Sequence, residues 1–255
     1  GLHSFPKKMI VQIHCTGYSG STLLNACLDS IRGIRGLGEI SRTWKKDPVC
    51  PCSRCGWDCK FYDGVKSITN IHQLYPGEIL VDSSKEYSYS ADFNIVLFKY
   101  PHEFAESYQR HNGATVTQSF KLWMSLYAGV SNANYIMPFR RFCQQPKTEL
   151  SQICRSIGIK YHVDHDWWET DTHVIGGNTS VTNQYHGIAE SQQKYAKIHN
   201  HHQIVVDDYW RGDNQLKKDC LAEYEKQRTE FQNLFCNLGI TVDEMIGDCL
   251  QSKLL

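Results

Sequence analysis

Short apolar runs alternate along the chain with stretches in which apolar residues recur at helical spacing. The short runs predict strands at residues 9–14, 78–81, 94–98 and 203–206. The helical spacing predicts helices at residues 21–30, 102–111, 116–133, 148–157 and 215–238. Strands that alternate with helices are typical of an α/β protein, so we expect a central parallel sheet flanked by helices.

Composition narrows the class of protein. A chain of 255 residues can bury its own core, and we expect a single domain over residues 1–255, with a cysteine-rich loop insertion at 48–63. The formal net charge is zero, which is not typical of nucleic-acid binding, so no nucleic-acid partner is expected. No apolar run approaches the roughly 18 residues of a membrane span, and no signal-peptide pattern opens the chain. Eleven cysteines are an odd number, which favours a reducing, cytoplasmic location over a disulfide framework.

A glycine-containing turn follows the first predicted strand, where residues 16–24 are T-G-Y-S-G-S-T-L-L. Backbone N–H groups of such a turn, together with the positive end of the following helix dipole, bind phosphate groups. The nucleoside-triphosphatase form of this turn has a lysine after its last glycine. Here Gly20 is followed by Ser21 and Thr22, so the group that reaches the β- and γ-phosphates is absent. The turn therefore predicts a site for a different anion.

Polar residues also end the next two predicted strands. Residues 82–85 are D-S-S-K, so a carboxylate, two hydroxyls and an ammonium end this strand. The alternative interpretation is that Ser83 or Ser84 caps a helix and the lysine is solvated. Lys99 ends the following strand, and Ser107 lies eight residues later on a predicted helix. The two could bind a second phosphate, or they could be an edge lysine and an ordinary helix serine. Because ligands of parallel sheets bind beyond the carboxyl ends of the strands, we expect these groups to lie near the turn.

Taken in order, these motifs resemble the sulfotransferase superfamily that uses 3′-phosphoadenosine-5′-phosphosulfate (PAPS), especially its bacterial branches. The resemblance covers about residues 9–210 and includes G-E at 38–39 and H-V-I-G-G-N at 173–178. It implies a P-loop-like α/β fold and no need for magnesium. It also implies transfer of a sulfuryl group from PAPS to a hydroxyl, less often an amine, of a small molecule or glycan, with 3′,5′-adenosine bisphosphate (PAP) as product.

The resemblance assigns roles to individual residues. Glu39 is expected to be the general base on the acceptor hydroxyl, and Lys85 to stabilise the bridging or leaving oxygen. His102 is either a reserve base or a surface residue at a helix start. The expected donor-binding residues are Gly17, Tyr18, Ser19, Gly20, Ser21, Thr22, Lys99, Ser107, Gly177 and Asn178.

The chain departs from the family pattern at Tyr18, where many members have a basic residue, and at Lys99, where arginine is usual. Arg42 or Arg110 could supply a further cation. Two alternatives follow: a non-catalytic nucleotide-binding paralogue, and a P-loop kinase that uses ATP and magnesium with Asp82 as a metal ligand.

Four cysteines, Cys50, Cys52, Cys55 and Cys59, follow one another within ten residues. Structural zinc sites usually pair two knuckles across a longer loop, so the expectation here is that no metal is bound. Zinc, an iron–sulfur cluster, local disulfides and free thiols are the alternatives. A similar cysteine-rich stretch occurs in some bacterial members of the family. Residues 161–173, rich in histidine, carboxylate and tryptophan, favour a packing loop or an aromatic wall over a metal site.

Overall fold

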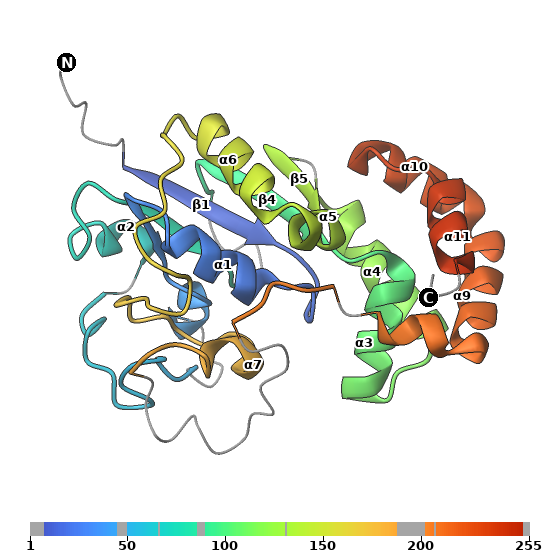
Figure 1. Ribbon diagram of the computed structural model, residues 1–255, viewed down its shortest axis with the longest axis horizontal. Helices are drawn as coiled ribbons and strands as arrows, with labels where there is room; N and C mark the ends of the chain where they lie inside the picture. The colour runs from blue at the N-terminus through green and yellow to red at the C-terminus, as the bar shows by residue number, and fades with distance from the viewer. Residues whose placement is uncertain are drawn as a thin grey trace.

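The core of the structure is a parallel sheet of five strands in the order β2-β3-β1-β4-β5 (Figure 1). The computed structural model describes residues 8–44, 50–65, 67–85, 90–130, 132–187, 202–206 and 208–251. The strands are β1 (Met9–His14), β2 (Ile34–Gly36), β3 (Ile79–Asp82), β4 (Phe93–Phe98) and β5 (Tyr135–Pro138). The predicted class, a central parallel sheet flanked by helices, is confirmed.

Helices cover both faces of this sheet. They are α1 (Ser21–Asp29), α2 (Ile68–Ile71), α3 (Pro101–Asn112), α4 (Val116–Ala128), α5 (Phe139–Gln144), α6 (Pro146–Ser156), α7 (Thr179–Thr182), α9 (Asn214–Lys226), α10 (Arg228–Leu238) and α11 (Val242–Leu250), with 3₁₀ helices η1 (Ile40–Trp44) and η2 (Tyr209–Gly212). Figure 1 shows α9, α10 and α11 gathered beside α3 and α4 at one end of the molecule. Among the described residues, no helix is long and apolar enough to cross a membrane.

Successive side chains of a strand point to opposite faces of the sheet, and this alternation determines which helices each side chain contacts. In β1, Val11 and Ile13 pack with α1 and α6, whereas Ile10 faces the cluster that contains α2. In β4, Val96 and Phe98 face the cluster built by α3, α4 and the three C-terminal helices. The sheet is therefore buried on both sides, as its nearly continuous apolar strands predict.

Three of the predicted elements differ from the structure. Residues 203–206 form no strand; Ile204 and Val206 pack on the core without a ladder partner, which accounts for the alternating pattern. The predicted helix 116–133 ends at Ala128, with Gly129 as its C-cap. Strands β2 and β5 were not predicted; they include Gly36 and Pro138, residue types that are depleted in strands.

The third difference is the predicted helix 215–238, which is two helices separated at Gln227. The rings of Tyr224 and Phe231 are 5.3 Å apart, whereas residues seven positions apart on a straight helix lie about 10 Å apart. The turn lets both rings pack against Phe120, at 5.0 and 5.6 Å between centroids. The break thus follows from tertiary packing, and it has no glycine or proline signal.

Candidate functional site

The turn between β1 and α1 leaves the N-terminus of the helix open. Gly20 is the N-cap residue of α1, so no side chain caps the first N–H groups, which have no acceptor within the helix. Tyr18 and Gly20 both have positive φ, at 60° and 88°. A Cβ on Gly20 would lie 2.0 Å from the ring of Phe139, whereas one on Gly17 would meet no described atom within 4 Å. The turn is thus packed tightly against Phe139 at Gly20 and has open space at Gly17, where a phosphate group could approach the backbone.

Buried hydroxyl groups hold this turn against the sheet. The side chains of Thr16 and Ser19 are hydrogen bonded at 2.5 Å, and the Thr16 N–H donates to the Tyr127 hydroxyl at 3.1 Å. The Tyr127 hydroxyl in turn donates to the Leu97 carbonyl of β4 at 2.8 Å. The position of the turn is therefore fixed relative to the end of β4, where Lys99 follows.

Lys99 and Ser107 are in contact, which is compatible with the first of the two interpretations of their spacing given above. The Lys99 ammonium donates to the Ser107 hydroxyl at 3.1 Å and lies 5.5 Å from the ring centroid of Phe139. The structure therefore places Lys99 and the turn beside one phenyl ring, since the same ring packs against Gly20. Glu106 lies nearby, and the guanidinium of Arg110 contacts it at 3.0 Å, so Arg110 is engaged on its own helix.

Glu39 lies between two cations. Its side chain is 4 % exposed; Lys85 donates to Oε1, and Arg42 donates to Oε2 at 2.5 Å. Arg42, considered above as an additional phosphate ligand, is thus engaged by the predicted base. Both cations reach solvent, with 25 % of the Lys85 side chain and 44 % of the Arg42 side chain exposed. The predicted pair Glu39 and Lys85 is therefore in direct contact, and its lysine can reach a ligand.

Two neighbours of this pair have structural roles. Asp82 is fully buried, and its Oδ1 accepts hydrogen bonds from the N–H and the hydroxyl of Ser84, which shape the chain that leads to Lys85. A carboxylate used in this way is poorly placed to bind magnesium, which disfavours the kinase alternative. Cys15, at the end of β1, is also buried, and burial raises the pKa of its thiol to about 11.

Residues 173–178, the H-V-I-G-G-N segment, run past the turn and past Glu39. The Glu39 N–H donates to the Ile175 carbonyl at 2.7 Å, and the Asn178 N–H donates to the Thr22 hydroxyl at 2.8 Å. A Cβ on Gly177 would lie 2.7 Å from Cγ2 of Thr22. The structure therefore brings Gly177 and Asn178 onto the turn, although it uses the Thr22 hydroxyl to hold them.

Tyr18 extends from the turn towards α3. Its ring stacks on His111 at 4.5 Å, and its hydroxyl accepts a hydrogen bond from Asn112 at 3.4 Å. Together with Tyr108, 6.4 Å away, it forms an aromatic surface one helical turn from Ser107. Tyr18 therefore contributes to a surface suited to stacking a planar ring.

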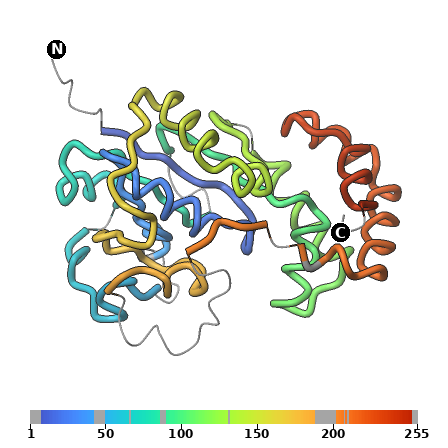
Figure 2. The backbone as a smooth tube through the Cα atoms, in the orientation of Figure 1, coloured from blue at the N-terminus to red at the C-terminus, as the bar shows by residue number. Residues whose placement is uncertain are grey.

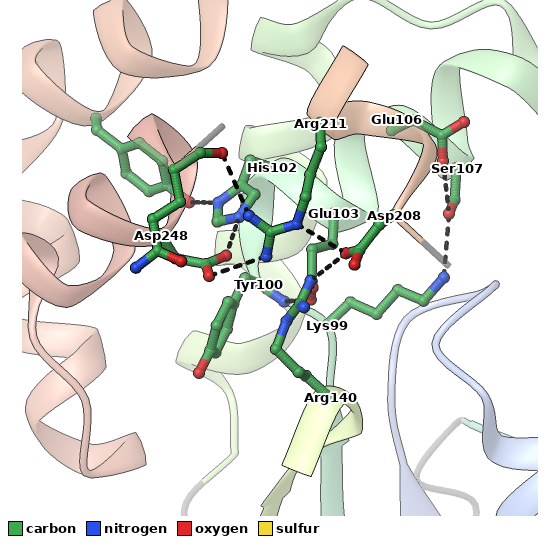
Figure 3. A network of polar contacts seen from close by, with 12 residues as sticks. Lys99, Tyr100, His102, Glu103, Glu106, Ser107, Arg140, Asp208, Arg211 and Asp248 are labelled. Carbon is green, nitrogen blue, oxygen red and sulfur yellow. Dashed lines mark hydrogen bonds and ion pairs between the residues drawn. The ribbon is translucent and has the colours of Figure 1, made fainter. Parts of the chain in front are cut away.

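His102 is neither a surface residue nor a free base. It is 1 % exposed and is hydrogen bonded to the Tyr224 hydroxyl at 2.8 Å and to Asp248 at 2.9 Å (Figure 3). Arg211 and Arg140 extend this network to Asp208 and Glu103. These contacts join α3 to the C-terminal helices, and no sequence signal could have revealed partners so distant along the chain.

The cysteine loop divides into two parts. Cys52, Cys55 and Cys59 converge on His173, which the sequence placed in a different loop, and their ligand atoms lie within 4.8 Å of one another. Cys50 lies outside this group, against Gly176. The four consecutive cysteines considered above are therefore not the set that the fold brings together, and His173 is the residue that the sequence reading missed.

Comparison with known proteins gives distant structural matches. No protein-family model and no curated protein matches the chain. Among solved structures, it is similar to the sulfotransferase domain of the Synechococcus PCC 7002 olefin synthase, with 14% identity, a TM-score of 0.49 and coverage of 89% of this chain and 96% of that one. It is also similar to the sulfotransferase domain from the curacin biosynthetic pathway, with 14% identity, a TM-score of 0.48 and coverage of 88% and 99%. Likeness at this level assigns no reaction to this chain, so its own residues must indicate one.

Proposed function

We propose that the protein is a sulfotransferase that moves a sulfuryl group from PAPS to a hydroxyl, less often an amine, of a small molecule or glycan. The observation that carries this proposal is the contact between Lys85 and Glu39 beside a phosphate turn that lacks the triphosphatase lysine. A lysine that can reach the leaving oxygen and a carboxylate that can take a proton are the two groups that sulfuryl transfer needs.

The donor would be held at two anionic groups. The open N–H groups at the start of α1, with the hydroxyls of Ser21 and Thr22, fit the 5′-phosphosulfate. Lys99 with Ser107 fits the 3′-phosphate, because a charged and a neutral donor already converge there. The aromatic surface of Tyr18 and His111 fits the adenine.

Every bond and proton of the proposed transfer can be accounted for with groups of the donor, the acceptor and the protein. The acceptor oxygen bonds to sulfur, the bond between sulfur and the bridging oxygen breaks, and the acceptor proton passes to Glu39. Lys85 leaves Glu39 to donate to the departing phosphate oxygen, while Arg42 keeps Glu39 Oε2 in place. The release of Oε1 by Lys85 would couple donor binding to exposure of the base.

Binding of PAP and of 5′-AMP, which lacks the 3′-phosphate, tests the donor assignment by calorimetry. We expect PAP to bind more tightly, and Lys99→Ala to remove most of this preference, a loss of about tenfold to a hundredfold for a charge-assisted hydrogen bond. Lys121→Ala, on the exposed side of α4, is the control and should retain the preference. Binding of ATP with magnesium but not of PAP would replace this proposal with the kinase. Tight PAP binding that Lys99→Ala leaves intact would remove Lys99 from the site.

A further inference from the structure

Three thiols of one loop and one imidazole of another meet at a single point. The Sγ atoms of Cys52, Cys55 and Cys59 and Nδ1 of His173 all lie within 4.8 Å of one another. The geometry points to a structural zinc site with these four ligands. We infer that it fixes the segment after His173 against the phosphate turn and Glu39. This inference is independent of the proposed sulfuryl transfer, because it concerns a metal that the cluster itself would bind.

The distances have the form that a single central ion would give. Each of the three sulfur atoms lies 3.5 Å from His173 Nδ1. In a tetrahedral site with usual zinc–sulfur and zinc–nitrogen bonds, the sulfur-to-nitrogen separation is about 3.5 Å. One imidazole nitrogen has a single proton or lone pair to share, so hydrogen bonding does not explain three equal contacts. A common centre between the four atoms explains them.

The cysteine loop is preorganised for this ligand set. Cys52 and Gly56 exchange two backbone hydrogen bonds of 2.9 Å, which close a tight turn around Cys55. Gly56 has φ 69°, a conformation that favours glycine. The Arg54 N–H donates to the Cys52 sulfur at 3.4 Å, a contact of the kind that orients a thiolate ligand. Cys52 and Cys55 are thus held in a C-x₂-C turn, the spacing of a zinc knuckle.

The histidine is oriented just as firmly. Its ring stacks on Phe61 with centroids 4.2 Å apart and planes inclined by 5°. The Tyr62 hydroxyl donates to the His173 carbonyl at 2.8 Å. Aromatic packing and a hydrogen bond within the protein therefore direct Nδ1 of His173 towards the three sulfur atoms without the help of an ion. Support of this kind around a ligand is typical of metal sites.

The alternatives fit less well. No cysteine of the described residues forms a disulfide bond, and three of them converge on His173. An iron–sulfur cluster binds its ligands on different irons, which separates them more widely than ligands of one ion. Within the described part of the chain the group consists of three cysteines and one histidine. Three thiolates and one imidazole favour zinc, in a closed site rather than a catalytic one. The sequence analysis expected no metal because four cysteine ligands within ten residues would be crowded. In the fold the fourth ligand is His173, from a distant loop, and not Cys50, so this objection does not apply.

The site would act on the segment that follows it. Before His173, the hydroxyl groups of Thr170 and Thr172 donate to the buried carboxylate of Asp29. After His173, Ile175 bonds to Glu39 and Asn178 bonds to Thr22. Figure 2 shows the two loops, residues 50–62 and 170–178, side by side beneath the sheet. Loss of zinc should therefore loosen the contacts that position Glu39.

Metal analysis of the purified protein tests the inference. We expect about one equivalent of zinc per chain by plasma mass spectrometry. After cobalt replaces zinc, we expect the visible absorption of a tetrahedral ion and a thiolate-to-metal charge-transfer band. His173→Ala should lose most of the zinc and change the cobalt spectrum, whereas Cys50→Ser should retain one equivalent and the native spectrum.

A second variant keeps the test decisive if His173→Ala does not fold. His173→Cys should retain zinc, because a thiolate can replace the imidazole nitrogen as the fourth ligand of a tetrahedral zinc ion. Its cobalt spectrum should shift towards that of four sulfur ligands. Wild-type protein that binds neither zinc nor cobalt under reducing conditions would overturn the inference. So would unchanged zinc content in His173→Ala, or the loss of titratable thiols to disulfides in metal-free native protein.

Discussion

Two networks of carboxylates and cations lie near the carboxyl end of the sheet, and they differ in the exposure of their cations. Glu39 is paired with Lys85 and Arg42, whose side chains are 25 % and 44 % exposed. In the second network, which contains Glu103 and Asp248, the side chains of Arg140 and Arg211 are only 12 % and 10 % exposed. A cation that reaches solvent can exchange its carboxylate for a ligand. An enclosed cation cannot do so without leaving a buried charge unpaired.

The enclosed network has the properties of a structural link. It begins at Glu103 in the first turn of α3, passes through Arg140 of α5 to Asp208, and continues through Arg211 of η2 to Asp248 of α11 (Figure 3). It therefore joins the sheet region to the C-terminal helices through four elements. Exposure of the cations, rather than burial of the acid, separates a candidate reactive site from a structural one here.

The largest effect that we expect comes from Glu39→Gln. If the exposed network is catalytic, removal of the base should lower the turnover of PAPS and acceptor by about 10² to 10⁴. The affinity for PAP should change little, because Glu39 is not among the predicted donor ligands. Single-turnover rates and calorimetric binding separate the two effects. Turnover within a factor of two of wild type would show that Glu39 is not the base.

The enclosed network should show the opposite behaviour. Glu103→Gln should lower the free energy of unfolding by about 3 kcal/mol, because Arg140 loses a buried partner. Turnover per folded molecule should be unchanged. Glu244→Gln is a matched control, since Glu103 and Glu244 both occupy the third position of a capping box, but Glu244 is exposed. Urea denaturation of both variants measures the difference. If both variants lost the same unfolding free energy, the effect of Glu103→Gln would come from the lost helix cap and not from the ion pair with Arg140.

The features that were predicted correctly are local in the sequence. The turn at residues 17–22 is continuous. The contact between Lys99 and Ser107 spans eight residues, from the end of β4 into the second turn of a helix that starts at Pro101. Parallel strands place all their carboxyl ends at one edge of the sheet. It could therefore also be predicted that the residues which follow these strands lie near one another.

The features that were missed depend on long chain separations. His173 meets Cys52 from 121 residues away, and His102 meets Asp248 from 146 residues away. Spacing rules apply within an element or between adjacent ones, so they could not pair these residues. The same limit explains why His102 was interpreted as a surface residue or a reserve base: its environment is made by helices that the local sequence does not specify.

The smallest expected effect concerns the far end of the enclosed network. Burial alone would raise the pKa of Asp248, but the hydrogen bond and charge of His102, with Arg140 and Arg211, lower it overall. A carboxyl whose pKa is lowered by folding stabilises the native state above its ordinary pKa of about 3.9. That contribution is lost as the pH falls through the folded-state value.

Asp248→Asn should therefore cost about 1 to 2 kcal/mol of unfolding free energy at pH 7. The difference from wild type should narrow below about pH 4, because the unfolded chain then binds a proton at Asp248 that the folded protein binds only at lower pH. Asp219→Asn, at an exposed position on α9, should show no such pH-dependent difference. Urea denaturation at pH 7, 5, 4 and 3 gives the comparison. A difference that stays constant across this range would mean that the Asp248 charge does not stabilise the link, and that the enclosed network acts through hydrogen bonds and packing alone.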